Sequence, residues 1–343
     1  MKTAEFDYNL PSELIAQTPI EPRDASRLMV LNRRTSDILH RSFRDLPEFL
    51  EAGDLLVHNQ SRVIPARLFA RKPTGGKGEI LLLRERDDGT WKALVGGKRI
   101  RVGLRLNLLD GPSGGPVGAG VEVLEAGERG MRILTFDQPA LPLAERVGVT
   151  PLPPYIHTPL ADADRYQTVY ARAPGSAAAP TAGLHFTPKL LQQLQEMGVY
   201  STFVTLHIGL DTFRPVREEY IEDHHMHTEY CSLEQEAAEQ LNRTRLEAHR
   251  VAAVGTTSVR TLESAARESR TIQPFAGMTD LFISPGYDFR AVDVLITNFH
   301  LPCSTLLMLV SAFAGKELLD RAYAEAIRER YRFYSFGDAM LIL

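Results

Sequence analysis

The sequence predicts an α/β fold in which a larger α/β sheet domain carries an inserted small β-barrel domain. On both sides of residues 62–152, apolar strand-like runs alternate with short loops and helical patterns, as in an α/β sheet. Between residues 63 and 152, short strand-like runs alternate with Gly, Pro and Asp turns, and no segment has helical period. With 343 residues the chain exceeds the usual size of one domain. We therefore expect a discontinuous α/β catalytic domain, residues 1–61 and 153–343, interrupted by a barrel of residues 62–152.

The barrel strands are predicted at residues 79–83, 91–95, 100–109, 120–124 and 131–136. Along residues 99–106, alternation places Arg99, Arg101 and Arg105 on one strand face and apolar side chains on the other. From residue 62 to residue 105 the chain holds twelve Lys or Arg and four acids, a balance of +8. Such a basic face either contacts a phosphate backbone or is a solvated outer surface.

The α/β region after the barrel predicts strands at residues 199–206, 251–254 and 292–296 and helices at 259–267 and 306–314. Thr187 can cap a further helix, because Pro188 then occupies its first position. Four loops rich in His, Thr, Ser or Gly adjoin these elements, at residues 177–188, 207–215, 255–258 and 298–305. Ligands bind at the carboxyl ends of the strands in open α/β sheets, so we expect the four loops to converge on an active site.

Composition narrows the class of protein. A hydrophobic share of 44% and a charged share of 24% are ordinary for a globular chain. No apolar stretch approaches the roughly 18 residues of a membrane span, and residues 1–7 contain no apolar signal region, so we expect a cytoplasmic protein with no membrane partner. Cys231 and Cys303 lack CxxC spacing, which argues against a disulfide framework or a thiolate zinc site.

Several long motifs occur in one order along the chain. They are FDYNLP (6–11), LIAQ (14–17), SRVIPAR (61–67), PLPPYI (151–156), YQTVY (166–170), APTAGLHF (179–186), VTLH (204–207), HMHTE (225–229), VGTTSVR (254–260), TNFHLP (297–302) and YRF (331–333). With these motifs the chain resembles the S-adenosylmethionine:tRNA ribosyltransferase-isomerase family of queuosine biosynthesis from end to end. It departs from the family pattern at Asp211, where the family usually has Gly, at Cys303, where a basic residue is common, and within residues 57–61.

The resemblance implies a reaction that consumes S-adenosylmethionine as a ribosyl donor, so no cofactor and no metal is expected. The modified ribose is transferred to the aminomethyl group of 7-aminomethyl-7-deazaguanine at the tRNA wobble position, giving epoxyqueuosine and releasing methionine and adenine. In the mechanism proposed for the family, a base first removes a proton from the ribose carbon beside the sulfonium, and adenine then leaves. The expected partners are this tRNA and S-adenosylmethionine, and we expect a monomer.

Histidines are the first candidates for the base, because their unperturbed pKa lies near neutrality. We predict that His185 is the base, since it lies just before a capped helix start whose positive end disfavours imidazolium. His207, at a strand end beside Asp211, would then position the ribose or assist the departure of adenine. The alternative for each is a packed structural histidine. The candidate catalytic residues, all in matched motifs, are His185, His207, His225, His227 and His300.

Other residues in or beside the motifs are candidates for substrate binding. Thr256, Thr257 and Ser258, at a helix N-terminus, would either hold the methionine carboxylate or simply cap the helix. The remaining polar candidates are Arg62, Arg67, Thr181, Arg214, Arg260, Asn298 and Arg332 for the substrate and Arg99, Arg101 and Arg105 for tRNA.

Aromatic and acidic residues complete the candidates. Phe186, Phe299 and Tyr334 would stack on adenine or face the sulfonium, with a place in the apolar core as the alternative. Asp211 and Glu229 would orient a histidine or protonate adenine, unless they belong to buried structural pairs.

Two other classes of protein compete with this interpretation. In a His-ligated metallohydrolase, His225 and His227 would share one strand face, and His185, His207 or His300 would complete a metal site. The resemblance disfavours this class because proton transfer needs no metal, and a tightly bound zinc lost together with activity would favour it. A non-catalytic RNA-binding module would explain the basic barrel but would leave the His-rich loops without a purpose.

Overall fold

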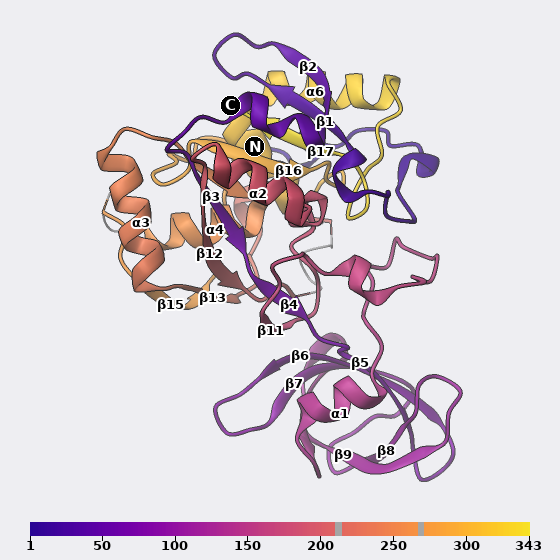
Figure 1. Ribbon diagram of the computed structural model, residues 1–343. Coiled ribbons are helices and arrows are strands. Elements are labelled where there is room, and N and C mark those ends of the chain that lie inside the picture. Colours follow the sequence, from indigo (N-terminus) through magenta and orange to yellow (C-terminus); the bar gives the residue numbers. More distant parts are fainter. Residues whose placement is uncertain (210–214, 267–270) are drawn as a thin grey trace. The chain divides into compact units, whose positions relative to one another are not determined.

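The computed structural model describes residues 1–209, 215–266 and 271–343, which form two compact units. The first, here called the sheet unit, comprises Met1–Ser61, Pro154–Ala173 and Ala179–Leu343. The second, the barrel unit, comprises Arg62–Pro153 and Pro174–Ala178. Figure 1 shows an α/β sheet in the first and a small β-barrel in the second, so the predicted fold class is confirmed.

The sheet unit is built on one mixed sheet of nine strands. Four central strands run parallel, so their carboxyl ends lie at the same edge. The strands beyond them include antiparallel neighbours, so the sheet is not a simple series of parallel units. In order across the sheet, the strands are β15 (Phe275–Thr279), β13 (Glu229–Leu233), β12 (Tyr200–Leu206), β3 (Leu55–Asn59), β14 (Val251–Val254), β16 (Val294–Asn298), β17 (Ala339–Ile342), β1 (Arg27–Leu31) and β2 (Ile38–Ser42). Among them β12, β3, β14 and β16 form the parallel group.

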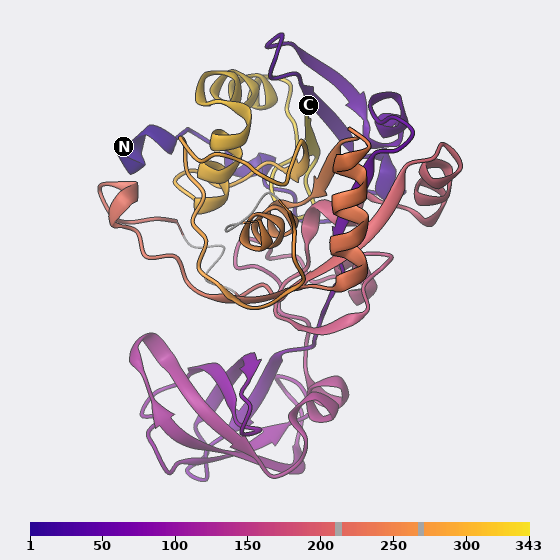
Figure 2. The ribbon, with the colours of Figure 1, turned by 90° about the vertical axis from the view of Figure 1, so that its left-hand side faces the viewer.

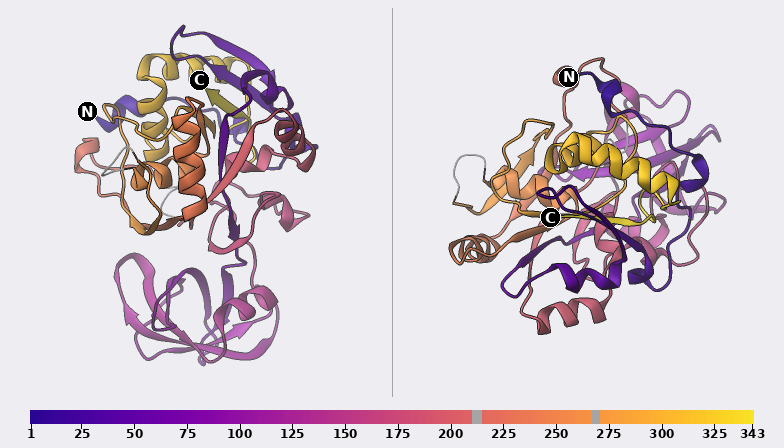
Figure 3. Two further views of the ribbon diagram at one scale, coloured as in Figure 1. Left: turned by 60° about the vertical axis from the view of Figure 1, so that its left-hand side comes forward. Right: turned by 90° about the horizontal axis from the view of Figure 1, so that it is seen from above.

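Helices cover both faces of this sheet (Figure 3). One face packs against α3 (Gln235–Leu246), α4 (Thr256–Ala265), α5 (Thr305–Ala314) and α6 (Lys316–Arg328). The other packs against α2 (Pro188–Glu196) and the 3-10 helix η4 (Phe43–Phe49). As predicted, Thr187 caps α2, since its hydroxyl accepts the Leu190 N–H at 3.1 Å, and Pro188 opens the helix. The apolar sequence of α5 is buried as expected.

The barrel is closed by six antiparallel strands, drawn from another side in Figure 2. Side chains alternate between its interior and solvent, as in β7, where Trp91, Ala93 and Val95 are buried and Lys92 is exposed. Closure leaves no unpaired sheet edge. Around the barrel the strands are β10 (Met131–Phe136), β7 (Trp91–Gly96), β6 (Lys77–Glu85), β5 (Arg67–Arg71), β8 (Arg105–Leu109) and β9 (Pro116–Ala126).

Two sequence-based expectations for the barrel are wrong. The strand predicted at 100–109 begins only at Arg105, because the backbone is left-handed at Arg99 (φ 57°) and Gly103 (φ 76°). Arg99 and Arg101 therefore lie in turns and share no strand face with Arg105, and Val102, expected in the core, is 55% exposed. The region also contains a helix, α1 (Ala140–Val147), whose apolar side the sequence analysis overlooked.

The remaining strands are short. They are β4 (Ser61–Val63) and β11 (Ala173–Ser176), which pair with each other where the chain passes from one unit to the other.

In the described part of the chain, no helix has the length and apolar character needed to cross a membrane.

Candidate active site

A pocket in the sheet unit lies at the carboxyl ends of β14 and β16 and encloses about 640 Å³ of empty space, part of it open to solvent. Only about 60 Å³ of this space is cavity volume in the usual sense, less than the about 300–1,000 Å³ of typical small-molecule sites, so a ligand of that size would also occupy the open part. Each of the four loops expected to converge supplies at least one lining residue. Thr181 comes from the 3-10 helix η7 (Thr181–His185), Ile208 follows β12, Thr257 lies in the first turn of α4, and His300 follows β16.

The start of α4 forms one part of the pocket wall. Gly255 precedes the helix with φ 88°, a conformation that favours glycine, and provides no side-chain cap for the first-turn N–H groups. Thr256 and Thr257 line the pocket. The Thr257 hydroxyl is buried and has no hydrogen-bond partner among the residues described. Ser258 does not line it, because its hydroxyl donates to the Val254 carbonyl at 2.8 Å. The helix start thus presents donors and a positive dipole end to a ligand.

His300 is the candidate histidine that lines the pocket. Its backbone is fixed on both sides: its N–H donates to the Tyr323 hydroxyl at 2.9 Å, and its carbonyl accepts the Tyr8 hydroxyl. Nε2 lies 3.4 Å from the Thr297 hydroxyl, whereas Nδ1 has no hydrogen-bond partner in the described ranges. Burial lowers the pKa of His300 to about 3, so the ring is neutral at pH 7.

His185 lies behind the wall instead of in it. Nδ1 is hydrogen-bonded to the Ser26 hydroxyl at 2.7 Å, and Nε2 accepts the Asn298 amide N–H at 3.1 Å. The Asn298 carbonyl oxygen accepts the Thr181 hydroxyl at 2.9 Å. Burial first, then Arg332 and Arg23, lowers the pKa of His185 to about 3. His185 is therefore neutral as expected, but both ring nitrogens are engaged, Nδ1 with Ser26 and Nε2 with Asn298, which lines the pocket together with Thr181.

The other three histidines are not in the pocket wall. His207 follows β12, stacks on Tyr230 with ring centroids 5.9 Å apart, and has its pKa lowered by burial. His225 is exposed, and His227 lies 3.4 Å from Glu229 Oε1. His225 and His227 precede β13 and lie outside any strand, so the expectation that they share a strand face is wrong. In residues 1–209, 215–266 and 271–343, no group of three or more His, Cys, Asp or Glu is arranged to hold a metal ion.

Glu229 and Arg260 form a buried ion pair, which was the structural alternative stated for Glu229. The side chains are 2% and 3% exposed. Glu229 also accepts the Gly209 N–H at 2.8 Å, and Arg260 donates to the Leu281 carbonyl at 3.2 Å. Burial would raise the pKa of Glu229, but the Arg260 guanidinium, His227 and the Gly209 N–H outweigh it and lower the pKa to about 2. Glu229 is thus a fixed carboxylate in β13 that connects this strand to α4 and to the loop after β12.

The aromatic candidates divide between the core and the pocket. Phe186 is fully buried against Phe43 and lines no part of the pocket. Phe299 lies at the pocket wall but is fully buried among aromatic rings. Tyr334 lines the pocket with φ 70° and packs on Tyr155 at 4.7 Å between centroids. Sequence reasoning missed Tyr155 as a site residue, although it lies in the PLPPYI motif.

The remaining predicted residues lie elsewhere. Arg332 donates its backbone N–H to Asp338 at 2.8 Å and does not line the pocket. Arg62 and Arg67 belong to the barrel unit, where Arg67 pairs with Glu79 at 3.3 Å. The final two, Asp211 and Arg214, lie outside the described residues.

Comparison with known proteins gives matches over nearly the whole chain. The sequence model of a family described as queuosine biosynthesis protein matches residues 3–342. The S-adenosylmethionine:tRNA ribosyltransferase-isomerase of Symbiobacterium thermophilum is 55% identical over 349 residues, with 100% of each chain covered. The protein of that name from Thermus thermophilus is 56% identical over 341 residues, with 98% of each covered. The crystal structure of S-adenosylmethionine tRNA ribosyltransferase from Thermotoga maritima matches with a TM-score of 0.57 and 44% identity, over 99% of this chain and 100% of that one.

Proposed function

Because the chain belongs to the family of queuosine biosynthesis proteins, we propose that it transfers and isomerises the ribosyl moiety of S-adenosylmethionine onto tRNA. The acceptor is the aminomethyl group of 7-aminomethyl-7-deazaguanine at the wobble position, and the products are epoxyqueuosine-tRNA, adenine and methionine. S-adenosylmethionine is consumed as a substrate, with no resident cofactor. The observation that carries this proposal is the sequence identity of 55–56% to enzymes of this name over nearly the full length of both chains.

The pocket described above is the proposed site for S-adenosylmethionine. In this proposal the methionine carboxylate of S-adenosylmethionine binds at the start of α4, where the uncapped helix end and the Thr257 hydroxyl offer donors to an anion. Thr181, Tyr155 and Tyr334 are among the polar and aromatic residues of the rest of the wall. An aromatic face attracts a cation such as the sulfonium. These groups bind and orient the donor but do not carry out proton transfer.

His300 is the proposed base. It lines the pocket, is neutral at pH 7, and has a ring nitrogen without a protein partner in the described part of the chain. Such a nitrogen can accept the proton removed from the ribose carbon beside the sulfonium. His185 has no nitrogen left for this role, so its contribution is to position Asn298 and Thr181.

The reaction is tested by mass spectrometry of the products. Purified protein with S-adenosylmethionine and tRNA carrying the precursor base is expected to release adenine and methionine together and to add the modified ribose to the tRNA. The same tRNA without the precursor base serves as the control and should give no release. Methylated RNA as the product, or release of adenine without any RNA, would contradict the proposal.

The carboxylate site is tested by replacing Thr257 with Val, which removes the hydroxyl but keeps the branched shape. A hydrogen bond to a charged group contributes about 1.5–3 kcal/mol, so binding of S-adenosylmethionine should weaken by about ten- to a hundredfold. Binding of decarboxylated S-adenosylmethionine should hardly change. Calorimetric titration measures both dissociation constants.

Thr261→Val is the matched control for this variant. Thr261 lies one turn further along α4, is fully buried, and donates to the Thr257 carbonyl at 3.0 Å without lining the pocket. Its replacement should leave the preference for the carboxylated ligand unchanged. If Thr257→Val weakened the binding of both ligands equally, the carboxylate would not bind at this end of the pocket.

A further inference from the structure

Two turns at one end of the barrel bring together six cationic side chains, here called the basic tip. Arg71, Lys72 and Lys77 lie in and beside the turn from β5 to β6, and Lys98, Arg99 and Arg101 lie in the connection from β7 to β8. Two contacts join these turns. Lys72 Nζ donates to the Lys98 carbonyl at 2.5 Å, and a Cβ on Gly97 would lie 3.1 Å from the Lys77 carbonyl.

The basic tip is not neutralised. Residues 71–77 and 97–104 contain no Asp or Glu. Within the described part of the chain, none of the six cations forms an ion pair, whereas other barrel arginines do, as Arg67 with Glu79 at 3.3 Å and Arg105 with Asp137 at 2.7 Å. Five of the six side chains are exposed, and Lys72 is half-buried. The tip is therefore a compact surface of positive charge available to a partner.

Two features of the tip act against folding stability. Arg71 and Lys77 are directly opposite each other on β5 and β6, and like charges in such a pair are destabilising. Arg99 adopts a left-handed backbone conformation (φ 57°), which costs energy for a residue with a side chain. The Arg71–Lys77 pair and the backbone of Arg99 therefore lower the stability of the fold, and no ion pair inside the described part of the chain offsets this loss. An external anion would provide the compensating interaction.

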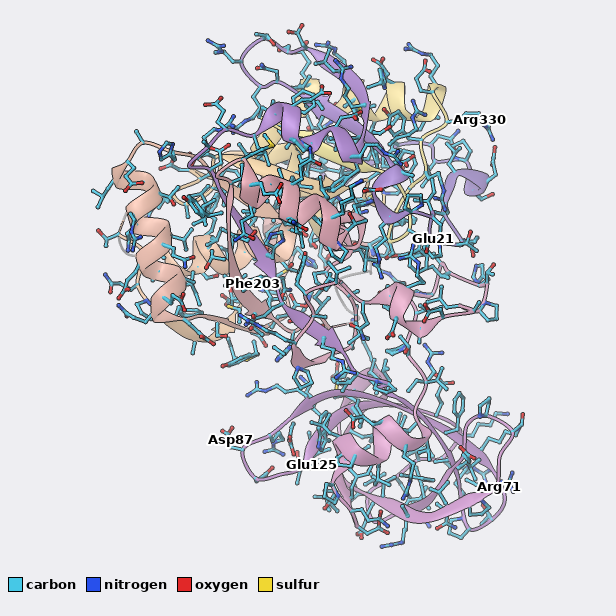
Figure 4. All side chains as sticks on the ribbon, viewed as in Figure 1. Glu21, Arg71, Asp87, Glu125, Phe203 and Arg330 are labelled. Atoms are coloured by element: carbon cyan, nitrogen blue, oxygen red, sulfur yellow. The ribbon has the colours of Figure 1, made fainter. Side chains whose placement is uncertain are left out.

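The opposite end of β6 offers a comparison inside the same barrel. Arg84 and Lys92 are also directly opposite each other. There, however, residues 84–92 hold three acids and three cations, and Arg86 lies 3.3 Å from Glu125. Figure 4 shows Arg71 well separated from Asp87 and Glu125. The charge is thus balanced at one end of β6 and unbalanced at the other.

We propose that the basic tip binds the phosphate backbone of tRNA. This proposal rests on the proposed function only in the choice of tRNA as the polyanion. Lysine and arginine side chains that contact phosphates release counterions, so such binding weakens steeply with salt and does not depend on the base sequence. The notion of a basic strand face formed by Arg99, Arg101 and Arg105 is replaced by two turns, and Arg105 is excluded because Asp137 neutralises it.

The test compares two triple variants that each remove three positive charges. The tip variant is Arg71→Gln, Lys77→Gln and Arg99→Asn, with Asn chosen because it tolerates a left-handed backbone. The control variant is Arg84→Gln, Arg86→Gln and Lys92→Gln. The dissociation constant for tRNA is measured at several salt concentrations, with the precursor-containing tRNA and with the same tRNA without the precursor base. Binding of S-adenosylmethionine and the melting temperature are measured alongside.

The tip variant should bind both tRNAs at least about tenfold more weakly at about 0.1 M salt, and its salt dependence should be smaller by about two to three in log–log slope. Its melting temperature should stay equal or rise, since like-charge repulsion is removed, and S-adenosylmethionine should bind as before. The control variant should keep the parent salt slope. An unchanged slope in the tip variant, or an equal loss in the control variant, overturns the proposal. Failure of the parent protein to bind any tRNA would instead contradict the proposed function.

Discussion

Replacement of His300 with Gln is expected to lower kcat by about 10²- to 10⁴-fold, the usual contribution of a general base. The loss should fall on the proton-removal step, because His300 lines the pocket and its Nδ1 has no hydrogen-bond partner in the described residues. The sensitive measurement uses S-adenosylmethionine carrying deuterium at the ribose carbon beside the sulfonium. Loss of this deuterium to solvent or product should cease in the variant, while both substrates still bind.

His185→Gln is the informative comparison for this variant. His185 joins Ser26 to Asn298, so its replacement should lower the melting temperature and raise the KM for S-adenosylmethionine. The deuterium should still be removed at a measurable rate. If His185→Gln binds both substrates and stays folded but removes no deuterium, while His300→Gln remains active, the base is His185 and our assignment of His300 is wrong.

Glu229→Gln is expected to cost about 3–5 kcal/mol of unfolding free energy, because it leaves the Arg260 guanidinium buried without a counterion. Urea unfolding at pH 7 measures this loss. The double variant Glu229→Gln with Arg260→Met removes both charges and should recover a large part of it. A loss below about 1 kcal/mol in Glu229→Gln would show that the pair does not hold α4 to β13.

The same pair gives a defined pH dependence. The pKa of Glu229 is lowered on folding to about 2, so the unfolded chain binds the proton more tightly. Its contribution to stability is fully present above the ordinary carboxyl pKa of about 4.5 and is lost as the pH falls toward 2. Below pH 4.5 the parent protein should therefore lose unfolding free energy more steeply than the double variant.

Sequence patterns predicted the elements that are regular in period. The strand at 251–254 and the helix capped by Thr187 are found as expected, because alternation and capping are local properties. The turn at residues 97–104 was not predicted, because alternating Arg and apolar residues mimic a strand and only the backbone at Arg99 reveals the reversal. An alternating pattern in the sequence does not by itself show where a strand ends and a turn begins.

For the site, the sequence predicted the loops but not the roles within them. Thr257 and His300 were among the candidates, and both line the pocket. The sequence favours His185 over His207 as the base because of its place before a helix, yet burial lowers the pKa of His300 to about 3 just as it does for His185. What separates them is the hydrogen-bond partner of each ring nitrogen. Ser26 is 159 residues from His185 in sequence, so no local pattern could have indicated it.

The position of β17 bears on how the chain can acquire its fold during synthesis. This strand follows every other strand in sequence, yet it lies between β16 and β1 in the sheet and pairs with β1 in parallel. β1 and β2 can pair with each other at once, but this pair can join the rest of the sheet only after residues 339–342 have been synthesised. The barrel strands, all within residues 67–136, meet their partners much earlier. Pairings so distant in sequence form slowly, which leaves β1 and β2 exposed to chaperones or to wrong partners for the longest time.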